Sequence, residues 1–248
     1  MITIKSAKQV ELMRKSCALT RELFDILESH IKPGVSTNTL DKIAYDFYTS
    51  KGARPNFLHY GGYPKSICTS VNDEVVHGIP NKHGILRSGD IVSVDMGCEL
   101  NGWNSDAART FAVGKISDEA QKLIDVTREC FFEGIKYVKH GAKIGDISAA
   151  IQEYAESRGY GVVRDLVGHG IGRSLHEDPS VPNFGKAGRG VKLVAGMALA
   201  IEPMITAGDY HVSVLDDDWT VVTDDGSLAA HYENTIVVTR DGCEILTL

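Results

Sequence analysis

An internal repeat is the feature that most constrains how this chain folds. The first half of the sequence matches the second at a constant offset of 107 residues, which carries Thr20 onto Thr127. The matches are Thr20-Arg21-Glu22 with Thr127-Arg128-Glu129, Phe24 with Phe131, Ile31-Lys32 with Val138-Lys139, Gly34 with Gly141, Phe47 with Tyr154, Gly52 with Gly159, and Leu86-x-x-Gly89 with Leu193-x-x-Gly196. A constant offset of this kind predicts two similar halves that pack as a pseudo-twofold pair around a central cleft.

Each half begins with a pattern typical of two helices. Apolar residues at helical spacing predict helices over residues 6–30 and 37–50 in the first half. The same spacing predicts helices over residues 117–138 and 147–158 in the second half. The halves therefore share an order of elements as well as scattered identities.

Strands follow the helices in both halves. Runs of apolar and β-branched residues predict strands over residues 91–95 and 106–113, and again over 197–205 and 233–239. We therefore expect an α+β fold. No long flexible linker interrupts the chain, so we expect one domain of residues 1–248, with halves of about 1–113 and 114–248.

Acidic residues fall inside these apolar segments. Asp95 ends IVSVD, Glu202 interrupts MALAIEPMI, and Glu233 precedes NTIVVT. The offset of the repeat carries Asp95 onto Glu202, and a hairpin over residues 92–110 would place Asp106 roughly opposite Asp95. Buried carboxylates that face one another repel unless they have a partner. Salt bridges would be the simplest explanation, but Arg109 is the only basic residue in these segments.

Three histidines are candidates to join the acids. His169 and His176 lie in GHGIGRSLHEDP, where glycines at 168, 170 and 172 predict a loop or strand whose backbone is close to a neighbour. His77 lies in VVHGIP. A single histidine is more often a packed core or surface group than a ligand, and only the nearby acids favour the ligand interpretation. His30, His59, His83, His140 and His211 lie in polar contexts and are expected at the surface; His231 is near Glu233 but has no separate argument.

Four carboxylates and one imidazole form an oxygen-rich ligand set. A single zinc ion usually takes fewer acids and more histidine or cysteine. Two divalent ions bridged by water suit the set better, and such a pair activates water and polarises a carbonyl or phosphoryl oxygen. These residues alone indicate a dinuclear metallohydrolase, with peptide and phosphoester substrates both open.

Bulk properties exclude several other classes. The formal net charge is −7 and no basic run occurs, which argues against a DNA-binding surface. The polar start MITIKSAKQVELMRK is unlike a secretory signal, and no window approaches ~18 consecutive apolar residues. Five scattered cysteines without a C-x-x-C motif are typical of free thiols in a reducing compartment. We expect a cytoplasmic protein without a membrane segment.

The sequence resembles the type I methionine aminopeptidases, metallopeptidases of the pita-bread fold, over essentially its whole length. Five motifs carry the resemblance, in this order: GGYPKSICTSVNDEVVHGIP, SGDIVSVDMG with NGWNSDAART, GHGIGRSLHEDP, MALAIEPM, and HYENTIVVT. The resemblance implies two pseudo-twofold-related α/β halves, with a central antiparallel sheet and outer helices. It also implies removal of the N-terminal methionine from nascent proteins and peptides with a small second residue.

The resemblance also implies a role for each site residue. Five residues match the family's metal ligands for two divalent ions: Asp95, Asp106, His169, Glu202 and Glu233, of which Asp106 and Glu233 bridge both ions. Glu202 would also act as the general base on the bridging water. His77 would assist at the scissile amide nitrogen, and His176 would stabilise the oxygen of the tetrahedral intermediate. The substrate's free α-amine would bind one ion.

Family similarity further points to a methionine pocket, formed by Tyr60, Tyr63, Cys68 and Trp219. Aromatic walls suit a polarizable thioether. The chain departs from the better-known bacterial pattern at two positions, where Phe57 replaces a cysteine and Leu175 replaces a phenylalanine. We therefore expect a pocket rim of different shape.

The family pattern also sorts the chain among subtypes and rivals. Only residues 177–201 separate His176 from Glu202, too few for the type II helical insertion, and no zinc-finger extension precedes the first helix, so we expect the short bacterial form. The resemblance implies action on nascent chains near the ribosome, with Co, Mn, Fe or Zn as the metal. We also expect a monomer, because no long apolar surface helix stands out in the sequence. The rivals are an X-Pro-type pita-bread peptidase, which usually carries a large N-terminal domain, and a non-catalytic pita-bread binding protein, which would lack metal ligands. A phosphoester hydrolase would need a cationic phosphate clamp.

Overall fold

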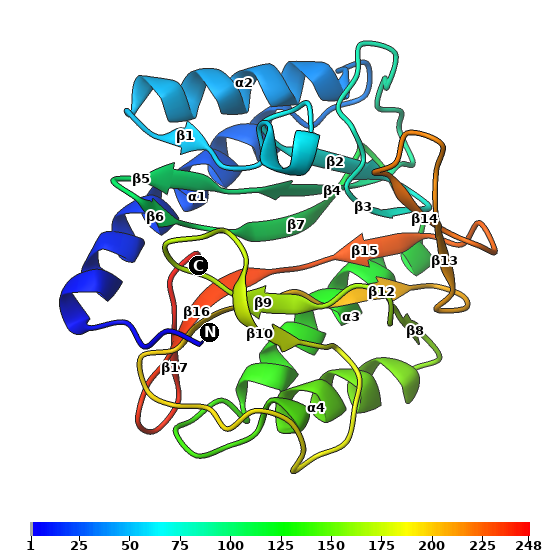
Figure 1. The fold of residues 1–248 in the computed structure, drawn as a ribbon. Helices are drawn as coiled ribbons and strands as arrows, with labels where there is room; N and C mark the ends of the chain where they lie inside the picture. Colours follow the sequence, from blue (N-terminus) through cyan, green and yellow to red (C-terminus); the bar gives the residue numbers. More distant parts are fainter. Residues whose placement is uncertain (1) are drawn as a thin grey trace.

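Two pairs of helices lie on the outside of the molecule, and the strands lie between them (Figure 1). The structure is a computed structural model that describes residues 2–248. The helices are α1 (Ala7–His30), α2 (Thr37–Ser50), α3 (Asp118–Ile135) and α4 (Ile144–Glu156), with a short 3₁₀ turn η1 (Tyr60–Gly62). The strands of the first half are β1 (Arg54–Pro55), β2 (Cys68–Val71), β3 (Glu74–Val76), β4 (Ile91–Met96), β5 (Cys98–Leu100), β6 (Trp103–Asn104) and β7 (Ala107–Ala112). Those that follow are β8 (Gly161–Val162), β9 (Gly168–Gly170), β10 (Glu177–Val181), β11 (Ala198–Ile201), β12 (Met204–Thr206), β13 (Val212–Val214), β14 (Val221–Thr223), β15 (Ala229–His231), β16 (Asn234–Val238) and β17 (Cys243–Ile245).

The four predicted helices are confirmed, with differences at the boundaries. Ser6 caps α1, because its side chain accepts the Gln9 N–H while the Gln9 side chain accepts the Ser6 N–H. Helix α3 ends three residues before the predicted 138. Helix α4 begins three residues before the predicted 147, because the carboxylate of Asp146 accepts the Lys143 N–H and stabilises an earlier first turn.

Every strand pairing within residues 2–248 is antiparallel. The two sheets that matter most for function have the orders β2-β4-β7 and β10-β9-β11-β16-β17. The remaining sheets have the orders β1-β5-β6, β15-β12-β8 and β13-β14-β3. The expected α+β fold with antiparallel sheets and outer helices is thus confirmed.

Strand β7 joins the first half to the second. The backbone N–H of Glu233 donates to the Ala108 carbonyl at 3.0 Å, and the hydroxyl of Thr110 both donates to the His231 carbonyl and accepts its N–H. Thr235 Oγ1 accepts the backbone N–H of residue 106 at 3.1 Å. Residues 231–235 therefore run beside β7, and this contact brings Asp106 close to Glu233.

One predicted strand is wrong. The apolar run over residues 197–205 is not one strand but two, β11 and β12, which belong to different sheets. The interruption falls at Glu202 and Pro203. Proline has no N–H to donate to a ladder, so the run leaves the five-stranded sheet there.

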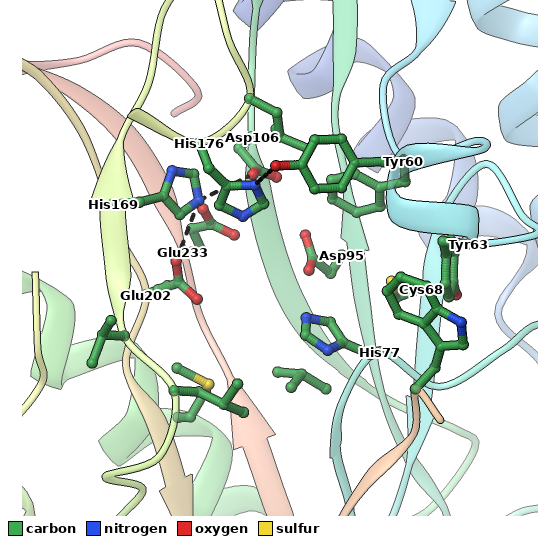
Figure 2. Close-up of a pocket in the computed structure, with 17 residues that line it drawn as sticks. Tyr60, Tyr63, Cys68, His77, Asp95, Asp106, His169, His176, Glu202 and Glu233 are labelled. Atoms are coloured by element: carbon green, nitrogen blue, oxygen red, sulfur yellow. Dashed lines mark hydrogen bonds and ion pairs between the residues drawn. The ribbon is translucent and has the colours of Figure 1, made fainter. Parts of the chain in front are cut away.

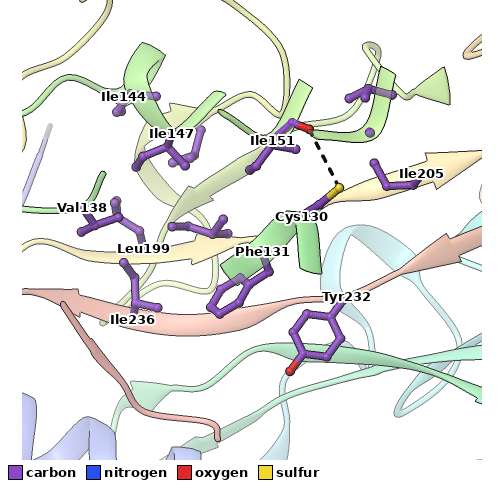
Figure 3. Close-up of a cluster of buried hydrophobic side chains, with 14 of the residues drawn as sticks. Cys130, Phe131, Val138, Ile144, Ile147, Ile151, Leu199, Ile205, Tyr232 and Ile236 are labelled. Carbon is purple, nitrogen blue, oxygen red and sulfur yellow. Dashed lines mark hydrogen bonds between the residues drawn. The ribbon is translucent and has the colours of Figure 1, made fainter. Parts of the chain in front are cut away.

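Apolar packing of helices on strands holds the second half together. Side chains of α3 and α4 pack on β11 and β16 in a buried cluster (Figure 3) that includes Phe131, Ile147, Leu199 and Ile236. Each fully buried side chain of this size contributes about 1.5–3 kcal/mol to folding. A second cluster packs α1 and α2 on β4, with Leu23, Leu40 and Val94 fully buried. The strand segments that carry the acids are therefore held from both sides.

The five cysteines are free thiols, as predicted. The predicted surface histidines are also confirmed, because His30, His59, His83, His140 and His211 are all exposed. Among the helices of residues 2–248, none combines the length and the apolar character that a bilayer crossing requires.

Candidate metal centre

The four acids lie at or beside strand ends that meet in the cleft. Asp95 is inside β4, whereas Asp106 immediately precedes β7, Glu202 immediately follows β11, and Glu233 immediately precedes β16. The expectation that these acids sit on strands therefore holds only for Asp95. Outside the strand ladder, a carboxylate can turn toward the cleft without the alternation that a strand imposes.

The predicted hairpin places Asp95 and Asp106 in one cavity. Strands β4 and β7 pair as expected, but the register partner of Asp95 is Ala108, two residues beyond Asp106. Asp106 therefore lies just beyond the ladder, in the same cavity as Asp95 but not directly opposite it. The segment between them forms a smaller hairpin of β5 and β6.

All five predicted ligands line one cavity of about 210 Å³ (Figure 2). His169 Nε2 lies 3.6 Å from Asp106 Oδ2 and 3.6 Å from Glu202 Oε1. Asp106, His169 and Glu233 each offer a ligand atom, and these three atoms lie within 4.8 Å of one another. Residues separated by more than 120 positions in the sequence thus converge on a volume that one or two ions can occupy.

Burial and mutual repulsion make this cluster unfavourable as it stands. Burial, followed by the charge of Asp106, raises the pKa of Asp95 and of Glu202 well above the ordinary range. Burial likewise raises the pKa values of Asp106 and Glu233. Within residues 2–248 the ion-pair partners of these acids are imidazoles alone, so salt bridges to lysine or arginine do not explain them.

Arg109, a basic residue of β7, directs its hydrogen bonds to other groups. Its guanidinium donates to the backbone carbonyls of Ala108, Glu233 and Thr247 and to the side-chain oxygen of Asn234. These bonds tie β7 to β16 and hold the backbone of Glu233. Burial and the neighbouring acids raise the pKa of Glu233, and the opposing effect of the Arg109 charge is smaller.

Several carboxylate oxygens have no hydrogen-bond partner. Asp95 Oδ1, Asp106 Oδ1 and Glu233 Oε1 are buried and unpaired. An unpaired buried polar oxygen is destabilising, and a cation that accepts oxygen ligands relieves several at once. The donor set of this cavity therefore fits a divalent metal ion.

His169 is oriented as a ligand. It lies on β9, where a Cβ on either flanking glycine would collide with a neighbouring carbonyl, that of Ala200 at Gly168 and that of Asp178 at Gly170. His169 Nδ1 lies 2.8 Å from the Gly170 carbonyl, which only accepts, so Nδ1 carries the proton and Nε2 presents its lone pair to the acids. Burial lowers the pKa of His169 to about 4, which keeps the ring neutral.

His176 and His77 face the same cavity from outside the acid cluster (Figure 2). The ring centroid of His176 lies 4.1 Å from that of His169, and Tyr60 Oη lies 2.7 Å from His176 Nδ1. Burial, then the neighbouring His169, lowers the pKa of His176 to about 4. Burial lowers the pKa of His77, whose backbone is left-handed with φ of 60°.

An apolar wall closes the other side of the cavity. Tyr63 is 3% exposed, and its hydroxyl donates to the carbonyls of Ile67 and Gly78, so its ring is fixed. The Trp219 ring lies 5.1 Å from the Tyr63 ring. Cys68, Phe57, Leu175 and Tyr60 also line the cavity. The two residues that depart from the bacterial pattern are therefore part of the wall.

One residue near the acids was missed by the sequence analysis. His231 is 1% exposed, and its Nε2 lies 4.0 Å from Glu202 Oε2 and 4.0 Å from Glu233 Oε2. Burial lowers the pKa of His231 to about 3. Its position two residues before Glu233, in an apolar run, was the available signal.

Comparison with known proteins agrees with this geometry. Residues 11–240 match the model of metallopeptidase family M24. The chain is 58% identical over 248 residues to a methionine aminopeptidase of Clostridium acetobutylicum, covering 100% of this chain and 99% of that one. It superposes on the crystal structure of methionine aminopeptidase from Rickettsia prowazekii with a TM-score of 0.98 and 47% identity, covering 100% of both chains. An Xaa-Pro dipeptidase from Bacillus anthracis shares the fold alone, with a TM-score of 0.79 and 24% identity, over 98% of this chain and 61% of that one.

Proposed function

We infer the reaction of this chain from its family: it belongs to metallopeptidase family M24, among the methionine aminopeptidases of the bacterial type I form. Its activity is that of a methionyl aminopeptidase, a hydrolase that releases an N-terminal methionine. One cavity contains unpaired, buried carboxylate oxygens beside an apolar wall. The proposed mechanism rests on this observation.

We propose that five residues hold two divalent ions: Asp95, Asp106, His169, Glu202 and Glu233. Asp106 and Glu233 would be shared by the two ions, which would be Co, Mn, Fe or Zn. Such ions would lower the pKa of a water molecule and polarise the carbonyl of the scissile bond. His169 contributes Nε2, because its Nδ1–H is committed to the Gly170 carbonyl.

Glu202 is proposed as the general base. Its side chain is 14% exposed, compared with 5% for Asp106 and 2% for Glu233. It is therefore the most accessible to water of these three acids. Its place after β11, at the strand interruption, leaves the carboxylate free of the ladder. From there it can take a proton from the attacking water and return one to the leaving amine.

The two cavity histidines are proposed to act on the scissile amide. If Tyr60 Oη donates to His176 Nδ1, the ring proton sits on Nε2 and can stabilise the oxyanion of the tetrahedral intermediate. His77 is assigned to the amide nitrogen of the leaving group. Neither histidine is among the proposed metal ligands, so their loss is expected to affect turnover more than metal binding.

The apolar wall is proposed to recognise the methionine side chain. Tyr60, Tyr63, Cys68 and Trp219 present aromatic faces and a soft sulfur, which suit a thioether. Phe57 and Leu175 narrow or reshape the rim. The free α-amine of the substrate restricts cleavage to the first residue.

The biological setting follows as part of the proposal. The proposed substrates are nascent proteins and peptides with a small second residue, in the cytoplasm and near the ribosome. The enzyme would act as a monomer with one catalytic domain, whose halves are about 1–113 and 114–248.

The deciding experiment measures methionine release from Met-Ala-Ser by chelator-stripped protein, before and after addition of manganese or cobalt. Release only with metal is the expected result, and acetyl-Met-Ala-Ser, which has no free amine, is the matched control that should not be cleaved. Metal binding without release, together with cleavage of an X-Pro peptide, would move the chain to the alternative specificity. Absence of metal binding would overturn the site.

A further inference from the structure

The candidate is His231, a buried imidazole that the proposed mechanism does not use. Both of its ring nitrogens are buried and have no hydrogen-bond partner. Its backbone is fixed on both sides, because β15 pairs Met204 with His231 and Thr110 Oγ1 bonds its N–H and carbonyl. The backbone of His231 is therefore fixed, and only rotation about the side-chain bonds can move the ring.

Its position relative to the acids is specific. Nε2 lies 4.0 Å from an oxygen of Glu202 and 4.0 Å from an oxygen of Glu233. His231 does not line the main cavity but does line a second cavity of about 360 Å³, together with Arg109 and Tyr232. The imidazole therefore lies beside the two carboxylates without being part of the lining of the main cavity.

Simple packing does not account for an imidazole here. A buried donor or acceptor without a partner is destabilising, and an apolar side chain of similar size would fill the space without that cost. At 4.0 Å neither carboxylate is hydrogen-bonded to Nε2, but a movement of about 1 Å brings the pair into range. Carboxylates that ligate metals are commonly held by such outer hydrogen bonds.

We propose that His231 is a positioning residue, whose Nε2–H donates to the Glu202–Glu233 carboxylate pair and holds it in the geometry that binds metal. The proposal rests on the proposed function, because it assumes that these two acids are ligands. The ring acts as a donor and not as a ligand, so one N–H must be sufficient for the role. The neutral ring then carries its proton on Nε2 and leaves Nδ1 as an acceptor.

Two variants separate the donor from the shape of the ring. His231→Gln keeps an N–H donor at similar reach, whereas His231→Leu keeps the volume and removes all donors. The measurement is manganese affinity by calorimetry on chelator-stripped proteins, with the melting temperature of each metal-free protein as the check of folding. The leucine variant should bind manganese about 10–100-fold more weakly. The glutamine variant should remain close to wild type, and metal-free His231→Leu should melt at or above the wild-type temperature.

Equal manganese affinity in wild type and His231→Leu would overturn the proposal. An equal loss in both variants would also overturn it, because it would make the ring a ligand or a shape requirement and not a donor. If the leucine variant does not fold, the comparison of wild type with His231→Gln alone still decides, since a large loss there contradicts the donor role. A wild-type protein that binds no metal would instead overturn the proposed function itself.

Discussion

The two halves of the molecule carry corresponding acids in different surroundings. Asp95 lies within β4, with β2 on one side and β7 on the other, so its backbone is fixed in a continuous ladder. Glu202, at the matching position of the repeat, lies where the second half's strand is interrupted before Pro203. Corresponding positions of the repeat can therefore both carry an acid while their local structures differ. Asp95 is held by the strands on both sides, whereas Glu202 is more accessible.

The walls of the cleft, by contrast, draw on both halves. The first half supplies Tyr60, Tyr63 and Cys68 to the apolar wall, and the second half supplies Leu175 and Trp219. Each half also supplies two of the acids, with His77 from the first half and His169 and His176 from the second. The proposed recognition of the substrate and the proposed chemistry therefore both depend on the two halves together.

The largest expected effect separates the two corresponding acids. Glu202→Gln should lower kcat by about 10²–10⁴-fold even at saturating manganese, because the general base is lost together with a ligand. Asp95→Asn should weaken manganese binding but regain activity as the metal concentration rises. Steady-state kinetics against a manganese titration makes the measurement. Equal recovery of both variants would remove the distinction between the halves.

His176 tests whether chemistry in the second half extends beyond metal binding. His176→Ala should lower kcat by about 10²–10³-fold, because a donor to the oxyanion is removed. Its manganese content, measured by elemental analysis after dialysis, should equal that of wild type. Loss of metal from this variant would instead make His176 a ligand.

A smaller effect is the pH dependence of stability, to which the acids of both halves contribute. Burial raises the pKa values of Asp95, Asp106, Glu202 and Glu233 above their ordinary values of about 4. A carboxyl with a raised folded-state pKa stabilises the fold below its unfolded pKa, and this contribution is lost as pH rises through the folded value. The metal-free protein should therefore lose this stabilisation above about pH 4. His169, with its pKa lowered to about 4, acts in the opposite direction between about pH 6.5 and 4.

Comparing manganese-bound with metal-free protein separates the pH dependence caused by the four acids from that caused by His169. Manganese binds the ionised carboxyls, so its affinity should rise about tenfold per pH unit for each proton displaced. The melting temperatures of both forms, measured from pH 5 to 8, should diverge as pH increases. A separation that stays constant over this range would contradict the assigned pKa directions.

The smallest expected effect on turnover concerns the contact between Tyr60, in the apolar wall, and His176. Tyr60→Phe keeps the ring of the apolar wall and removes the hydroxyl that lies 2.7 Å from His176 Nδ1. Loss of one hydrogen bond of about 1 kcal/mol predicts a decrease in kcat of about fivefold, with KM nearly unchanged. In the His176→Ala background the same change should have no further effect. Additive losses would show that Tyr60 acts independently of His176.

Much of the fold could be predicted because its signals are local. Helix caps such as Ser6 and apolar spacing identify α1 and α2 with their ends, and the buried acids are conspicuous in apolar runs. The boundaries of α4 and the division of residues 197–205 were predicted wrongly. Both depend on a single side chain or on the absence of one N–H, which spacing does not reveal.

The sequence by itself determined that α+β halves with corresponding helices would form, and it predicted that four acids and a histidine share a cation site. Only the tertiary structure decided which groups meet: the imidazole of His231 beside Glu202 and Glu233, and the hydroxyl of Tyr60 on His176. The reason is physical. Periodicity and capping act between residues a few positions apart, whereas the register of β7 against residues 231–235 is set by long-range strand pairing.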